Sequence, residues 1–218
     1  MRAQLLNEII AELNQIGAAS PMLVNRASTD KVYEIFVWSC VLRALGQIGA
    51  TMEARDSNDT LTTQIDFRLA PGLIYSPTTA PGFVLIDYNG KEYELQNSLR
   101  VLGSSKVLHE LDVCILDRSH ARRCRTIAID ADSSAVRFLA ECKYYGSNLP
   151  LHLGREFLGL GSEFSIRVKT IVANMTSSEV HTLVKRHRGT THFELTSANQ
   201  QNVAQFVGWL ATELKHAL

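Results

Sequence analysis

Two short segments hold the residues whose types and spacing are best suited to chemistry. They are HELDVCILD (109–117) and FLAECKYY (138–145), and each has the composition of a strand. Side chains alternate across a strand, so Glu141 and Lys143 share one face of the second segment. If the two strands pair, Asp112 joins them at one spot. Two carboxylates beside an ammonium group are suited to binding a divalent metal ion and hydrolysing a phosphodiester.

Each residue type in this trio has a physical reason. A phosphodiester is anionic and therefore a poor electrophile, and a Mg²⁺ or Mn²⁺ ion held by carboxylates neutralises its charge. We expect Asp112 and Glu141 to bind the metal ion, with the backbone carbonyl of Cys142 as an added ligand. We expect Lys143 to position the attacking water and to stabilise charge that develops on the phosphate oxygens.

The acid-x-Lys pattern is weak by itself. It occurs at Glu141-Cys142-Lys143 and again at 213–215, where it lies at a helix end and indicates surface charge. The first copy lies in an apolar strand, where charged groups are costly unless they are paired or bound. The alternative is a structural pair in which Lys143 simply neutralises buried acids, since ion-pair networks also perturb ionisable groups.

Two further acids accompany the trio. Glu34 is the only acid within 31–45, a helix that is apolar nearly all round, and we expect it to be a third metal ligand. Its alternative role is a first-turn acid that interacts favourably with the helix dipole. Glu110 shares a strand face with Asp112 and is either a supporting acid of the site or an exposed charge at a sheet edge.

Basic residues cluster in two places outside this motif. SHARRCR (119–125) is expected to form a loop between the two site strands, and KRHRG (185–189) a turn after a helix. Both are candidates for contacting nucleic-acid phosphates, as is Arg155 near the start of the helix after the site. Solubilising charge, a protein contact or a helix-face ion pair are the alternatives. The candidate phosphate contacts are Arg122, Arg123, Arg125, Arg155, Lys185, Arg186 and Arg188.

The elements that must position these residues follow from hydrophobic periodicity and turn signals. Asn89-Gly90 between two strand patterns predicts a type I′ hairpin. A helix between the strands 136–144 and 168–175 predicts that these pair in parallel. The fold class is therefore α/β, with a mixed central sheet flanked by helices on both faces. Helices are predicted over 4–16, 30–45, 151–163, 177–185 and from about 200. Strands are predicted over 64–70, 83–88, 92–96, 107–117, 136–144, 168–175 and 191–195. Residues 52–63 are predicted to form a loop, and Ser197 and Gln200 a capping box.

Length and composition set the outer limits. At 218 residues and 45% hydrophobic content the chain suits one globular domain, 1–218, with an N-terminal helix and linker (1–29), a core (30–175) and a C-terminal helical cap (176–218). Its formal net charge of zero disfavours a protein coated non-specifically in nucleic acid. The four cysteines lack metal-site spacing and favour a reducing compartment. With no membrane span or targeting signal in the sequence, we expect a cytoplasmic location.

The chain resembles the PD-(D/E)xK nuclease superfamily, which has the restriction-endonuclease-like fold. The resemblance rests on Asp112, on Glu141-x-Lys143 one strand later, on an upstream helix bearing Glu34 and on the element order over roughly 30–175. Leu111 stands where the family's name motif has proline. The resemblance implies a Mg²⁺- or Mn²⁺-dependent enzyme acting on DNA, most naturally an endonuclease of restriction or phage-defence type.

Three other functions stay open at this point. The first is a catalytically inactive nuclease-fold subunit that binds nucleic acid or a protein partner. The second is a structural interaction protein, and the third is an RNase. Because the sequence offers no separate target-recognition domain, we expect a homodimer, a partner subunit or low sequence specificity.

Overall fold

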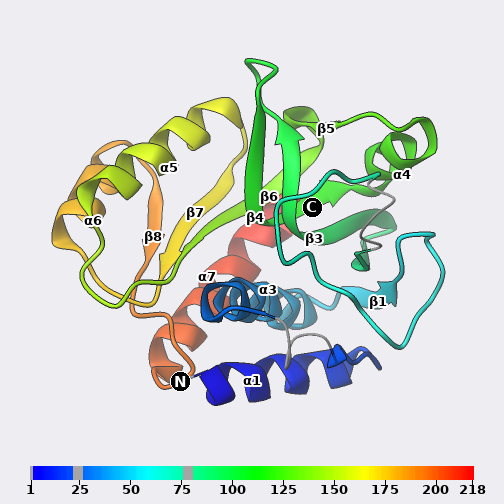
Figure 1. Cartoon of the computed structure of the whole chain (residues 1–218), viewed down its shortest axis with the longest axis horizontal. Helices are drawn as coiled ribbons and strands as arrows, with labels where there is room; N and C mark the ends of the chain where they lie inside the picture. Colours follow the sequence, from blue (N-terminus) through cyan, green and yellow to red (C-terminus); the bar gives the residue numbers. More distant parts are fainter. Residues whose placement is uncertain (1, 22–26, 76–80) are drawn as a thin grey trace.

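A mixed eight-stranded sheet forms the centre of the molecule (Figure 1). The computed structural model describes residues 2–21, 27–75 and 81–218, so part of the predicted linker, 22–26, lies outside the described residues. The strands lie in the order β1-β2-β3-β4-β6-β7-β8, and β5 pairs with β3. They span Thr51–Arg55 (β1), Phe83–Tyr88 (β2), Lys91–Leu102 (β3), Leu108–Asp117 (β4), Ala131–Asp132 (β5), Val136–Lys143 (β6), Val168–Ala173 (β7) and Thr190–His192 (β8).

Helices cover both faces of this sheet, as the sequence predicts. A buried cluster on one face joins α1, α3 and α7 to the sheet, and a second cluster on the other face joins α4, α5 and α6 to it. Figure 1 shows α1 and α3 stacked below the sheet, with α5 and α6 together on the far left. In the described part of the chain the helices span Arg2–Gln15 (α1), Thr29–Gln47 (α3), Arg118–Ile127 (α4), Leu151–Glu163 (α5), Ser178–Arg186 (α6) and Gln200–Ala217 (α7).

Two predicted connections between strands are confirmed. β2 and β3 form an antiparallel hairpin, in which Asn89 and Gly90 both have positive φ, of 53° and 75°. A type I′ turn requires this left-handed conformation at both central residues. β6 and β7 pair in parallel through the intervening α5. The α/β class and the mixed sheet are therefore confirmed.

Two predictions for residues 51–70 are wrong. Residues 51–55 form the edge strand β1 and not a loop, because an edge strand with one buried side chain, Ala54, lacks an apolar pattern. Residues 64–70 form no strand. Their backbone groups bond elsewhere: Ile65 N donates to Ala19 O, and the Asn97 side chain takes both the N–H and the C=O of Arg68.

Local structure differs at five other places, beginning with β3, which runs past the predicted 92–96 to Leu102 although residues 96–98 are polar. The segment 119–125 is the helix α4 and not a loop, because Ala121 and Cys124 give its polar sequence a narrow buried stripe. β8 ends at His192. Ser28, and not Thr29 or Asp30, is the N-cap of α3. The predicted capping box at 197–200 is absent because Asn199 caps α7 by accepting from Asn202 N.

Candidate functional site

The residues of the predicted motif come together in one cleft of about 710 Å³. The N-terminal turns of α3, the first half of β4, the end of β6 and the segment after β6 all border it. Its lining is strongly charged and consists of Thr29, Asp30, Lys31, Glu34, Glu110, Asp112, Glu141, Cys142, Lys143, Tyr144 and Tyr145. The four predicted metal-binding residues and Lys143 therefore share a single surface.

Strand pairing explains why Asp112 meets the acid-x-Lys motif. In the antiparallel β4–β6 ladder Val113 pairs with Ala140, so the next pair outward is Asp112 opposite Glu141. Asp112 Oδ2 accepts a hydrogen bond of 2.7 Å from the backbone N–H of Cys142. The Lys143 ammonium lies 2.7 Å from Glu141 Oε1. The two strands thus hold two carboxylates and one ammonium group at the end of their shared ladder.

The strand alternation is interrupted at the site itself. Leu111 packs in the cluster with α5, whereas Val113 packs in the cluster with α3, although an unbroken strand would place both on one face. Directly across from Asp112 on β3, the fully buried Ser98 has a φ of 43°. A non-glycine residue with such a φ costs about 1–3 kcal/mol, and backbone strain of this kind concentrates at functional sites.

Lys31 lines the cleft and the buried Ser98 hydrogen-bonds to Glu34, and neither residue was predicted from the sequence. The Lys31 ammonium contacts Glu34 Oε1 and Oε2 at 2.9 and 2.8 Å and Glu110 Oε1 at 3.4 Å. The Ser98 hydroxyl donates to Glu34 Oε2 at 3.1 Å. The signal for Lys31 was its spacing from Glu34, since oppositely charged residues three apart are neighbours on a helix. The signal near Ser98 was the polar run at 96–98, since Asn97 interrupts the alternation of Tyr93, Leu95, Leu99 and Val101.

Electrostatics in the cleft strongly disfavour ionised Asp112. Asp112 is only 7% exposed to solvent. Burial, together with the charges of Glu141 and Glu34, raises the pKa of Asp112 well above its usual value. The hydrogen bond from Cys142 N–H and the charge of Lys143 lower this pKa, but by less. Burial also raises the pKa of Glu34, and Lys31 offsets only part of that effect. A further positive charge in the cleft would therefore stabilise the ionised carboxylates.

The acids of the cleft raise the pKa of both lysines. Burial alone would lower the pKa of Lys143, but the charge and hydrogen bond of Glu141 outweigh it and the pKa is raised. The pKa of Lys31 is likewise raised, since Glu34 and Glu110 outweigh its burial. Both side chains are therefore ammonium ions near neutral pH. Burial also raises the pKa of the Cys142 thiol well above its usual value, so at this residue the carbonyl is the suitable ligand.

The donor chemistry of the cleft fits a hard divalent cation. Carboxylate oxygens and a backbone carbonyl are the ligands that Mg²⁺ and Mn²⁺ prefer. Within the ranges that the structure describes, no group of three or more His, Cys, Asp and Glu residues is arranged to hold a metal ion as it stands. In this structure Lys31 contacts both oxygens of Glu34, and Lys143 contacts Glu141.

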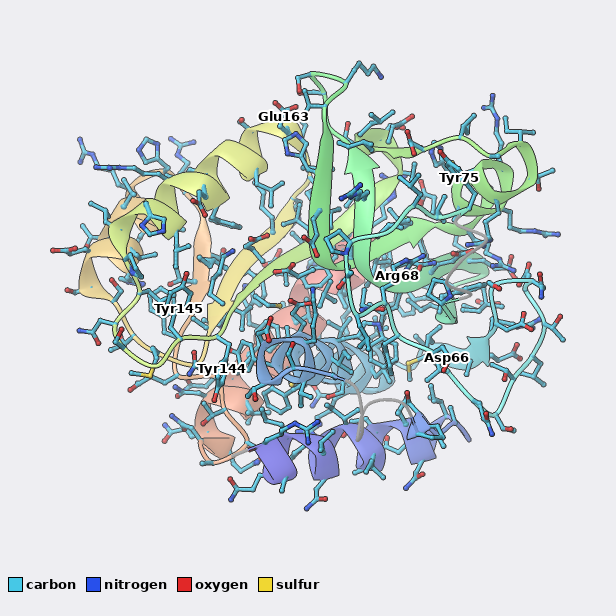
Figure 2. The ribbon with its side chains drawn as sticks, viewed as in Figure 1. Asp66, Arg68, Tyr75, Tyr144, Tyr145 and Glu163 are labelled. Atoms are coloured by element: carbon cyan, nitrogen blue, oxygen red, sulfur yellow. The ribbon has the colours of Figure 1, made fainter. Side chains whose placement is uncertain are left out.

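The segment that leaves β6 is fixed by one amide side chain. Asn174 Oδ1 accepts from Tyr145 N at 2.7 Å, and its Nδ2 donates to Tyr145 O at 2.8 Å. The neighbouring Tyr144 packs against Tyr33 of α3, with 5.6 Å between ring centroids. Figure 2 shows Tyr144 beside α3 and Tyr145 further along the chain toward α5. These contacts hold the aromatic rim of the cleft next to Lys143.

The predicted phosphate-contacting residues lie outside the cleft lining. Arg125 is held by Glu94 and is mostly buried, and Arg122 is exposed but lies 3.6 Å from Asp59. The remaining predicted residues are exposed on α4, α5 and α6 and the turn after α6, and they are Arg123, Arg155, Lys185, Arg186 and Arg188.

Comparisons with protein-family models, with curated proteins and with solved structures found no match. No helix in the described part of the chain has the length and apolar character needed to cross a membrane.

Proposed function

We propose that this protein is a Mg²⁺- or Mn²⁺-dependent nuclease that hydrolyses phosphodiester bonds in DNA, with the cleft as its active site. The restriction-endonuclease-like arrangement of the core, 30–175, is part of this proposal. One observation carries it: Glu34 on a helix, Asp112 on one strand and Glu141 with Lys143 on the next all line the same charged cleft.

Asp112 and Glu141 would hold the metal ion, with the Cys142 carbonyl and Glu34 as further ligands. When bound, a divalent cation supplies positive charge to the phosphate and lowers the pKa of a water that it holds. In the reaction a water oxygen bonds to phosphorus, one P–O ester bond breaks, and a water proton passes to the departing oxygen. The products are a phosphate monoester and an alcohol.

Lys143 would act as a cation and hydrogen-bond donor. Its raised pKa keeps the ammonium group protonated near neutral pH, so it is unsuited to accepting the proton of water. Instead it would orient the water and stabilise negative charge on the phosphate oxygens. Its contact with Glu141 keeps the ammonium at the acidic end of the ladder.

Exposed cations outside the cleft would contribute phosphate contacts. We retain Arg123, Arg155, Lys185, Arg186 and Arg188 in that role, because such contacts need flexible cations at a surface. Arg125 is assigned to the buried pair with Glu94. A homodimer or a partner subunit would bring a second cleft or further contacts to the duplex.

The test is cleavage by the full chain, with supercoiled plasmid and single-stranded RNA as parallel substrates. Mg²⁺, Mn²⁺ and EDTA define the metal requirement. Nicking or linearisation of the plasmid with metal, and none with EDTA, supports the proposal. Cleavage of RNA alone would make the protein an RNase. Metal-independent DNA binding without cleavage of either substrate would favour the inactive nuclease-fold subunit.

A further inference from the structure

The Lys31 ammonium group contacts both carboxylate oxygens of Glu34 in the cleft. We propose that Lys31 is a resident counter-cation that a divalent metal ion must displace, so that this lysine sets the metal concentration at which the cleft is loaded. This inference rests on the proposed function, because it concerns the same cleft. It adds a control element that the acid-x-Lys motif does not contain.

The contacts of Glu34 carry the argument. Both carboxylate oxygens accept from the Lys31 ammonium, at 2.9 and 2.8 Å, and Oε2 also accepts from the Ser98 hydroxyl. A cation that takes these oxygens as ligands must therefore replace the ammonium group. Like charges also repel at short range, so Lys31 and a divalent ion cannot share Glu34 without cost.

The charges of the cleft agree with binding of one divalent ion. Four carboxylates line it close to two ammonium groups, and they are Glu34, Glu110, Asp112 and Glu141 beside Lys31 and Lys143. Two formal negative charges remain, and Asp30 at the rim adds another. Without metal the lysines are the cations that the cleft itself provides. A bound divalent ion would balance the two remaining negative charges, so the charge count favours loading of the cleft. Lys31 is the ammonium group that contacts more of the acids, Glu34 and Glu110.

This arrangement differs from an ordinary helix-surface ion pair. Such pairs are exposed, and they contribute little to stability. Here the Lys31 side chain is only 14% exposed, and its partners come from α3, β3 and β4. The Ser98 hydroxyl accepts from Lys31 at 3.2 Å, and the left-handed backbone of Ser98 places that hydroxyl between strand and helix. The left-handed backbone of Ser98 therefore helps to hold Lys31 beside Glu34 when no metal ion is bound.

Direct binding of Mn²⁺ to the full chain tests the proposal without relying on activity. Wild type is compared with Lys31→Met, which removes the charge, and with Lys31→Arg, which keeps it. We expect the dissociation constant for Mn²⁺ to fall about tenfold or more in Lys31→Met, as close charge pairs are strongly coupled. We expect Lys31→Arg to bind no more tightly than wild type. Equal Mn²⁺ affinity of wild type and a folded Lys31→Met would overturn the proposal.

A second measurement needs no variant and so does not depend on the folding of Lys31→Met. Acetylation of wild type by a lysine-reactive ester, followed by mass spectrometry, reports the exposure of each lysine. We expect Lys31 to become several-fold more reactive at saturating Mg²⁺, while the exposed Lys185 stays unchanged. Continued protection of Lys31 in metal-loaded protein would contradict displacement.

The outcomes separate this inference from the proposed function. If wild type binds Mn²⁺ and Lys31→Met binds it equally well, displacement fails and the nuclease proposal stands. If neither wild type nor the variants bind Mn²⁺, both fail. If Lys31→Met alone binds Mn²⁺ measurably, the lysine is the block and the inference is supported.

Discussion

Asp112 and Cys142 are joined by a hydrogen bond of 2.7 Å from the Cys142 backbone N–H to Asp112 Oδ2. Cys142 lies between Glu141 and Lys143, so this bond fastens the acid of β4 to the centre of the motif on β6. The bond also pairs the Cys142 N–H, a backbone donor that the β4–β6 ladder would otherwise leave without a partner at its end. The carboxylate remains in a buried, negatively charged setting, which is costly for the fold without a bound cation.

The first prediction concerns the stability of Asp112→Asn. The folded-state pKa of Asp112 is raised, so the folded state holds this proton more tightly than the unfolded state. Its contribution to stability is full below the unfolded pKa and is lost as pH rises through the folded pKa. At pH 7 without metal, Asp112→Asn should therefore unfold at a higher urea concentration than wild type. The asparagine can still accept from Cys142 N–H.

Metal provides the control for that experiment. Saturating Mg²⁺ should stabilise wild type, because the ion binds only the folded state, and should have little effect on Asp112→Asn. The stability difference at pH 7 should shrink as pH falls toward 3. An asparagine variant that is less stable than wild type at pH 7 without metal would show that Asp112 is a structural acid.

The second prediction concerns Lys143. Lys143→Met should lower the rate of metal-dependent plasmid cleavage by at least about 100-fold, the typical loss for one transition-state hydrogen-bond donor. The variant should bind Mn²⁺ at least as tightly as wild type, since loss of the lysine removes a cation that contacts the proposed ligand Glu141. Cleavage rate and Mn²⁺ binding are measured on the same preparation. Full activity in Lys143→Met would remove the lysine from the proposed active site.

The third prediction separates structural acids from functional ones. Glu94 is fully buried and pairs with Arg118 at 2.5 Å and with Arg125. Glu94→Gln should lower the free energy of unfolding by about 3 kcal/mol, because it removes the buried carboxylate charge that Arg118 and Arg125 share. Mn²⁺ binding should be unchanged, as Glu94 lies outside the cleft lining. Urea unfolding and Mn²⁺ titration check the two parts, and a loss of Mn²⁺ binding by the folded variant would contradict this assignment.

The fourth prediction concerns pH and His192. Its ring packs against Trp209 and Phe206, at 4.5 and 4.9 Å between centroids, and burial lowers its pKa to about 4. The unfolded state therefore binds more protons, and stability falls as pH drops from about 6.5 toward 4, by about 3 kcal/mol at most. His192→Phe should show a smaller loss over that window. Equal pH dependence in wild type and variant would contradict the prediction.

Much of the architecture could be predicted because periodic apolar segments and turn residues are local signals. Asn89-Gly90 identified its hairpin, and the strand–helix–strand order from β6 to β7 gave a parallel pair. The polar edge strand β1 and the helix α4 were not predicted, because each buries few side chains. The segment 64–70 had a strand-like pattern, but its backbone partners are a loop and the side chain of Asn97, which no local pattern reveals.

The candidate site was predictable to the extent that it follows strand parity. Asp112, Glu141 and Lys143 line one cleft because β4 and β6 are antiparallel neighbours. Lys31 and Ser98 lie 67 positions apart, and their contact depends on how α3 packs against a strained point of β3. Such a contact arises from tertiary packing, so the spacing of residues along the chain cannot give it.

The most direct test of the central claim is plasmid cleavage with Mg²⁺ or Mn²⁺ by wild type, Asp112→Asn and the matched acid control Glu94→Gln. We predict that wild type and folded Glu94→Gln nick or linearise the plasmid, whereas Asp112→Asn is folded and inactive. Cleavage by Asp112→Asn at the wild-type rate, or no cleavage by wild type with either metal, would contradict the assignment of this cleft as a nuclease active site.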